Sequence, residues 1–154
     1  MHSRLNPLAA APASMKAMIA LEEHVRTSGL EHSLIHLVKT RASQINGCAY
    51  CVHMHTREAR ADGETEERLY LLSAWRESPL YTARERAALN WTESLTRIAD
   101  TGAPDADYEQ ARQQFSPEEL VKLTLLIGVI NTWNRIAVGF RAVHPTKEAA
   151  DAHG

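Results

Sequence analysis

Apolar residues recur along this chain at intervals of three and four positions, which is the spacing of one face of an α-helix. Between residues 33 and 44, Leu34, Leu37 and Val38 follow that spacing, and Ile45 continues it. No segment shows a convincing strand pattern. The pattern predicts helices over residues 13–27, 33–44, 48–61, 64–76, 82–100, 106–113 and 116–141. We therefore predict an all-α helical bundle.

The predicted helices have recognisable ends. Thr82 and Ser116 are each followed three residues later by a glutamate, Glu85 and Glu119, and this spacing is a capping box. In such a box the hydroxyl and the carboxylate each satisfy a free backbone N–H at the start of a helix. Glycines at the predicted helix ends stand at positions 29, 47, 63 and 102. These signals support the helical interpretation.

The predicted helix over residues 116–141 is apolar on nearly every side, unlike a helix at the periphery of a fold. Such a helix lies at the centre of a fold or at a subunit interface, so we expect a homo-oligomer. A length of 154 residues suits one domain, and we find no internal repeat. We expect a single domain over residues 1–154, with loose termini at 1–12 and 143–154.

Composition and charge narrow the class of protein. Hydrophobic residues make up 44% of the chain and the formal net charge is −2, which excludes a disordered chain. Bulk charge of this kind does not attract nucleic acid or an anionic membrane. The most apolar run, 123–130, is too short to cross a bilayer, and prolines interrupt the apolar patch near the N-terminus. We expect a cytoplasmic protein with neither a nucleic-acid nor a membrane partner.

The two cysteines, Cys48 and Cys51, are the most informative residues of the chain. A spacing of i and i+3 at a predicted helix start places both sulfurs on one face, where they can form a disulfide. The free N–H groups and the positive end of the helix dipole stabilise a thiolate at the first sulfur. His55 lies four residues beyond Cys51 on the same face, where its imidazole can accept a thiol proton. His53 projects elsewhere on the helix.

Three interpretations of this segment remain open from spacing alone. The favoured one is a redox-active dithiol. The second is a metal site formed by both cysteines and His55, with or without His53, although structural zinc usually takes ligands from two separated segments. The third is a pair of inert buried cysteines. The redox interpretation does not predict a thioredoxin fold, because the βαβ context of that fold is missing.

The segment around the cysteines resembles a known family. The residues 37–55 read LVKTRASQINGCAYCVHMH, and residues 57–60, 66–77, 85–92 and 130–136 extend the similarity over about residues 14–141. In this respect the chain resembles the AhpD-like alkylhydroperoxidases of the carboxymuconolactone decarboxylase superfamily. The Cys-x-x-Cys-x-x-x-His core after Ser-x-x-Asn-Gly is much more specific than a bare Cys-x-x-Cys.

The resemblance implies an AhpD-like all-α fold, a homo-oligomer such as a trimer or hexamer, and thiol-dependent reduction of hydroperoxides in antioxidant defence. It implies that Cys51 attacks the peroxide, that Cys48 resolves the resulting sulfenic acid to a disulfide, and that His55 assists. An external dithiol, from a thioredoxin-like or lipoyl protein, would restore the thiols. We expect no cofactor and no metal.

Two positions depart from the family pattern. The family's proton relay usually has a glutamate twelve residues before the first cysteine, where this chain has His36. The family often has a histidine just before the second cysteine, where this chain has Tyr50. His36 is either a substitute relay or a solvated or interface histidine, and Tyr50 either donates its hydroxyl or packs. We therefore expect weak peroxidase turnover.

Two other functions stay open. One is a carboxymuconolactone decarboxylase-like enzyme, whose chemistry needs no cysteine pair. The other is a non-enzymatic redox or metal-binding stress sensor. Outside the cysteine segment, Arg41 falls on the apolar face of its predicted helix, where a charge needs a partner. We expect a structural ion pair there.

Overall fold

In a computed structural model of the chain, which describes residues 1–145, all regular secondary structure is helical. The all-α prediction is therefore confirmed. The elements are α1 (Pro7–Ala10), α2 (Pro12–Arg26), α3 (His32–Ile45), α4 (Ala49–Ala61), α5 (Glu66–Leu71), the 3₁₀-helix η1 (Leu72–Glu77), α6 (Ala83–Thr96), α7 (Ile98–Thr101), α8 (Asp105–Arg112) and α9 (Pro117–Gly139).

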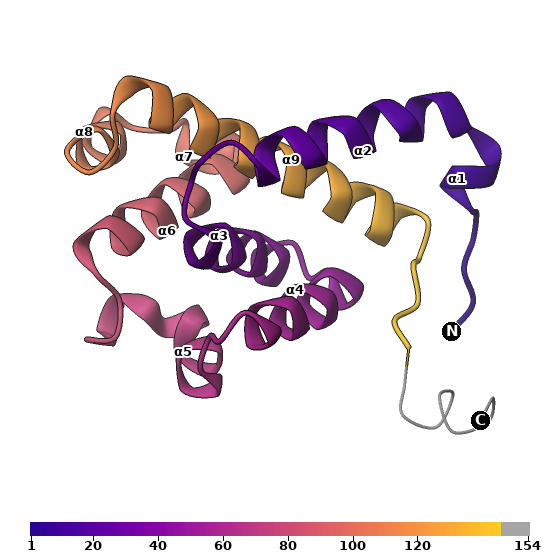
Figure 1. Cartoon of the computed structure of the whole chain (residues 1–154), viewed down its shortest axis with the longest axis horizontal. Helices are drawn as coiled ribbons and strands as arrows, with labels where there is room; N and C mark the ends of the chain where they lie inside the picture. The colour runs from indigo at the N-terminus through magenta and orange to yellow at the C-terminus, as the bar shows by residue number, and fades with distance from the viewer. Residues whose placement is uncertain (146–154) are drawn as a thin grey trace.

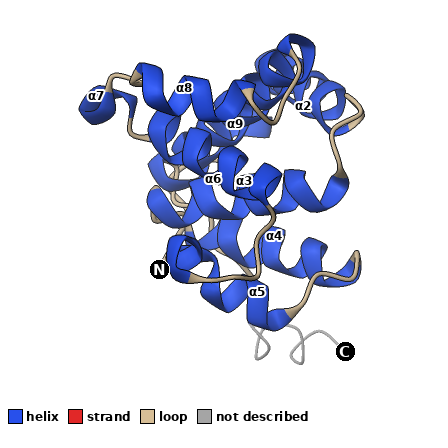
Figure 2. Ribbon diagram, turned by 90° about the vertical axis from the view of Figure 1, so that its left-hand side faces the viewer, coloured by secondary structure: helices blue, strands red, loops and turns tan. Residues whose placement is uncertain are grey.

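Helix α3 lies at the centre of the bundle and packs against α4, α6 and α9 (Figure 1). Helix α2 lies along α9, and the two together cover one side of α3 (Figures 1 and 2). Helix α3 suits this position because it is apolar on more than one side. Leu34 and Val38 join a core shared with α6 and α9, whereas Leu37 packs with Leu72 and Trp75 of the segment α5–η1.

The predicted helix ends agree well with the structure. Both capping boxes form, with reciprocal bonds between Thr82 and Glu85 and between Ser116 and Glu119. The four glycines expected at helix ends all have positive φ, a conformation in which a Cβ atom is strained. The ion pair expected at Arg41 is also confirmed, since its Nε donates to Glu93 Oε1 at 2.8 Å.

Some elements differ from the predicted ones. Helix α1 was not predicted; Asn6 caps its start by accepting from two backbone N–H groups. The predicted helix 82–100 is broken at Arg97. The hydroxyl of Thr101 donates to the carbonyl of Ser94, and it takes the place of the backbone N–H that would bond to this carbonyl in a continuous helix. The predicted helix 64–76 ends as a 3₁₀ turn, where Arg86 donates to three backbone carbonyls.

The start of the chain and the residues just after α9 lie on the same side of the bundle (Figure 1). In the segment 1–12, expected to be loose, the backbone N–H of Arg4 donates to the carbonyl of Phe140 just after α9. Residues 143–145 have no regular secondary structure, and residues 146–154 of the other expected loose end lie outside the described residues. Within residues 1–145, no helix combines the length and the apolar character needed to cross a bilayer.

Candidate active site

The two cysteines lie where a tight turn leads from α3 into α4. Gly47 has φ +64°, which turns the chain, and Cys48 then takes the N-cap position of α4. The sulfur of Cys48 accepts a hydrogen bond from the backbone N–H of Cys51 at 3.3 Å. The two sulfurs form a disulfide, and the residues' Cα atoms are 5.3 Å apart. The predicted pairing of the sulfurs at the start of a helix is therefore present.

A hydrogen-bond network fixes this turn to α9. The side-chain N–H₂ of Asn46 donates to Oδ1 of Asn131 at 2.9 Å and to Oδ1 of Asn134 at 2.8 Å. Asn134, which is 1% exposed, donates in turn to the hydroxyl of Ser43 at 3.0 Å. Because a side-chain amide presents donors and acceptors in fixed directions, the network holds the residues before Cys48 in one arrangement.

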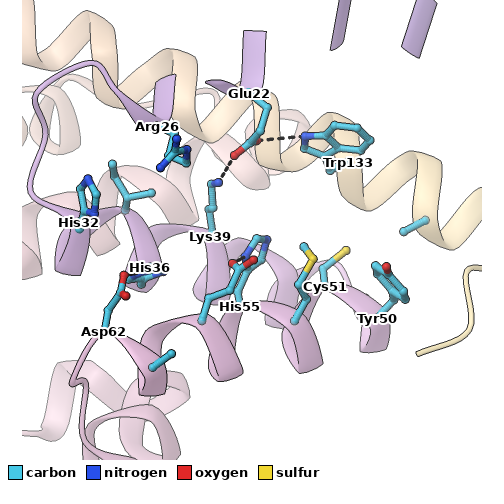
Figure 3. A pocket seen from close by; sticks show the side chains of 15 residues that line it. Glu22, Arg26, His32, His36, Lys39, Tyr50, Cys51, His55, Asp62 and Trp133 are labelled. Atoms are coloured by element: carbon cyan, nitrogen blue, oxygen red, sulfur yellow. Dashed lines mark hydrogen bonds and ion pairs between the residues drawn. The ribbon is translucent and has the colours of Figure 1, made fainter. Parts of the chain in front are cut away.

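A cavity of about 640 Å³ opens beside the disulfide, between α2, α3, α4 and α9 (Figure 3). Among the described residues, its lining includes Cys51 and not Cys48. His55 and Tyr50, both from α4, also line it, as does His36 from α3. The cavity therefore brings together four of the five predicted site residues, and Cys48 is the one that does not line it.

His55 is almost fully buried, with 4% of its surface exposed. Its Nδ1 lies 2.9 Å from Oε2 of Glu58, one turn further along α4. A hydrogen bond from His55 lowers the pKa of Glu58 below its usual value, although burial opposes the effect. The pair consists of an imidazole and an ionised carboxylate, which is an arrangement that can accept and return a proton.

A second imidazole–carboxylate pair lies further along the same cavity. Nε2 of His36 is 2.6 Å from Oδ2 of Asp62, and the side chain of His36 is 14% exposed. The hydrogen bond from His36 lowers the pKa of Asp62. His36 thus lies in the gap between α3 and the end of α4, and its imidazole is neither freely solvated nor turned away from the cavity (Figure 3).

The opposite wall of the cavity contains a buried charge. Lys39 of α3 is 5% exposed and its ammonium donates to Glu22 of α2. The other carboxylate oxygen of Glu22 accepts from the indole N–H of Trp133 at 3.1 Å. This chain of bonds joins three helices across the cavity, as the dashed lines in Figure 3 show. A lysine buried in this way requires such a partner.

Sequence reasoning missed the carboxylates of this site. Glu58 follows His55 by three residues, so the helical spacing alone was a usable signal. Asp62 and Glu22 reach their partners from other helices, and no sequence spacing indicates those contacts. His53, by contrast, projects elsewhere as predicted: it is absent from the cavity lining and stacks on His144, with ring centroids 4.8 Å apart.

The arrangement suits sulfur chemistry coupled to proton transfer. A vicinal pair of cysteines can cycle between dithiol and disulfide with the transfer of two electrons. The buried imidazole of His55, one helical turn beyond Cys51, supplies a proton acceptor, and the cavity that both residues line supplies room for a small molecule. Within residues 1–145, histidine, cysteine and acidic side chains do not gather in groups of three or more that would hold a metal ion.

A model of the carboxymuconolactone decarboxylase family matches residues 12–94. The uncharacterized protein YdfG of Bacillus subtilis is 41% identical over 138 residues, which cover 90% of this chain and 94% of YdfG.

Among the solved structures that share the fold are two at 25% identity or more. One is a protein of unknown function from Agrobacterium tumefaciens, proposed to be the antioxidant defence protein AhpD; it is 57% identical, with a TM-score of 0.93, over 95% of this chain and 100% of that one. The other is an uncharacterized peroxidase-related protein from Silicibacter sp. TM1040; it is 25% identical, with a TM-score of 0.76, over 88% of this chain and 71% of that one.

Proposed function

The chain is an AhpD-like member of the carboxymuconolactone decarboxylase family, and from that premise we propose that it is a thiol-dependent peroxidase that reduces hydroperoxides through Cys48 and Cys51. The observation that best supports this proposal is the position of Cys51. Cys51 lines the same cavity as the buried imidazole of His55, whereas Cys48 is not part of the lining. A substrate in the cavity would therefore meet Cys51 first.

In the first step the thiolate of Cys51 attacks the terminal oxygen of the hydroperoxide. An S–O bond forms, the O–O bond breaks, and the alkoxide leaves and takes up a proton as the alcohol. Cys51 is thereby oxidised to a sulfenic acid. In the second step the thiolate of Cys48 attacks that sulfur, the disulfide forms, and hydroxide leaves and is protonated to water. One hydroperoxide thus consumes one dithiol.

The cap position of Cys48 fits the second role. The backbone N–H of Cys51 points at its sulfur, and the dipole of α4 favours negative charge there. His55 is the proton acceptor for Cys51 and returns the proton to the leaving alkoxide. His36, beside Asp62, and Tyr50 line the same cavity and are the candidates for orienting the hydroperoxide. An external dithiol from a thioredoxin-like or lipoyl protein then reduces the disulfide by exchange.

The test uses reduced protein mixed rapidly with cumene hydroperoxide, with peroxide and free thiols followed together. We expect one disulfide per chain for each peroxide consumed. Cys51→Ser abolishes the reaction, whereas Cys48→Ser reacts once and leaves a sulfenic acid that dimedone traps at Cys51. Sulfenic acid trapped at Cys48 in a Cys51→Ser variant would reverse the two roles.

The same variants separate the peroxidase from the other functions of this family. A variant with serine at both positions is expected to be inactive toward hydroperoxides. If the double variant and the unmodified chain decarboxylate a lactone equally well and also consume hydroperoxide at the same rate, the cysteines are not the reacting groups and the proposal fails.

A further inference from the structure

Cys51, His55 and Glu58 occupy positions i, i+4 and i+7 of α4, so all three side chains lie on one face of that helix. All three also line the cavity. His55 follows Cys51 by about one helical turn and precedes Glu58 by about one more, so the three residues belong to a single rigid element. The order sulfur, imidazole, carboxylate therefore follows directly from the helical repeat.

The contact between Glu58 and His55 determines which ring nitrogen holds the proton. The carboxylate of Glu58 has a lowered pKa, so it is ionised near neutral pH and can only accept hydrogen bonds. Nδ1 of His55, at 2.9 Å, must therefore be the donor. In the neutral ring Nε2 then has the lone pair, and this is the nitrogen that can accept a proton from a thiol one turn away.

Charged groups on the neighbouring helix face the same pair. Lys39 and His36 of α3 both act on Glu58 electrostatically and lower its pKa, after the larger effect of His55 itself. Glu22 on α2 neutralises Lys39, and Asp62 is bonded to His36. With each of those groups already paired, Glu58 is the carboxylate in direct contact with His55.

We propose that Glu58 is a positioning residue for the cysteine chemistry: it fixes the Nδ1–H tautomer of His55 and stabilises the imidazolium that forms when Cys51 loses its proton. The inference rests on the proposed function. Position 36, where the resembled family usually has a glutamate, is a histidine in this chain. Its side chain is bonded to Asp62 and supplies no carboxylate to His55. Helix α4 supplies that carboxylate itself.

The experiment uses the full chain with Cys48→Ser, so that Cys51 is the single thiol. Two rates are measured from pH 5 to pH 9: the reaction of the thiol with cumene hydroperoxide and its alkylation by iodoacetamide. Glu58→Gln keeps a hydrogen-bond acceptor but loses the charge, and we expect about a threefold slower peroxide reaction at neutral pH. Glu58→Ala loses both, and we expect about a tenfold loss. In both variants the alkylation profile moves to higher pH, because the imidazolium has lost its counter-charge.

The control is Glu109→Gln on α8. Glu109 also bonds a residue three positions away, Arg112, and its side chain is 49% exposed, against 50% for Glu58. It lies outside the cavity lining, so neither rate should change. The circular dichroism of every variant reports whether the helices are intact.

The two readouts separate the two proposals. If the Cys48→Ser protein does not react with hydroperoxide but Glu58→Ala still moves the alkylation profile, the peroxidase proposal fails and the role of Glu58 stands. If the protein reacts with hydroperoxide and both Glu58 variants match Glu109→Gln in rate and in profile, Glu58 does not position His55 and the inference is wrong.

Discussion

The network that fixes the turn before the cysteines permits a quantitative prediction. Replacing Asn46 by alanine removes two hydrogen bonds, each of which contributes about 1 kcal/mol to stability. Oδ1 of Asn131 still accepts from Arg135 at 3.1 Å, but Oδ1 of the fully buried Asn134 loses the donor that Asn46 provided. That lost donor adds about 1 kcal/mol, and water entering beside the half-buried position 46 offsets part of it. We expect Asn46→Ala to lower the free energy of unfolding by about 2–3 kcal/mol in total.

The assay is urea unfolding of the oxidised protein, followed by far-ultraviolet circular dichroism, so that the disulfide is the same in every variant. With a slope of about 2 kcal/mol per molar urea, the midpoint falls by roughly 1 M. Asn46→Asp is the sharper test, since it places a carboxylate against two amide oxygens and should destabilise more than alanine. Gln113→Ala, at an exposed position at the end of α8, serves as control and should change stability by less than about 0.5 kcal/mol. An aspartate variant as stable as the unmodified chain would refute the hydrogen-bond argument.

Further outcomes follow from two other features. Burial by itself would raise the pKa of Glu93, but hydrogen bonds from Trp75, Arg76 and Arg41 lower it below the usual 4.5. Stability from this carboxylate is therefore present above that value and is lost as the pH falls through the folded-state pKa. Glu93→Gln should lower the free energy of unfolding by about 2–3 kcal/mol at pH 7, because Arg41 loses its counter-charge, and by much less once the pH is below the folded-state pKa of Glu93. An equal loss across a series of urea titrations at falling pH would contradict this. The 42% exposed Leu125 of α9 belongs to the apolar helix from which we expect self-association. Light scattering should give a mass above the 17.2 kDa of one chain, and Leu125→Glu should lower it; a monomer before the change would refute the expectation.

The sequence was sufficient to predict the fold class and most helix ends, because those depend on local signals. Capping boxes, helix-ending glycines and the i, i+3, i+4 spacing act within a few residues of one another, and α4 and its cysteines followed from them. The break at Arg97 was missed because its cause is a hydroxyl, that of Thr101, which competes for a carbonyl of the preceding turn. The spacing of apolar residues does not reveal a hydroxyl that competes for a backbone carbonyl, so it could not predict this break.

The candidate site was predictable only in part, because local signals fix positions along one helix but not the contacts between helices. The placement of Cys51 and His55 on one face is a property of a single helix. The orientation of His36 depends on how α3 packs against the end of α4, where Asp62 forms a hydrogen bond with its imidazole. The burial of Lys39 depends on its ion pair with Glu22 of α2. These contacts require the packing of separate helices, which spacing along one helix does not specify.

The cavity has two walls of different character. Helix α4 presents the sulfur, the imidazole and the carboxylate together, whereas α2 and α9 present Glu22 and Trp133 from across the gap. Substitutions on the far wall can therefore change the size and polarity of the molecule admitted, without moving the sulfur relative to the imidazole. Evolution can diversify ligand choice and conserve reactivity at two separate sets of positions, and an engineer who wants a new substrate should begin with α2 and α9.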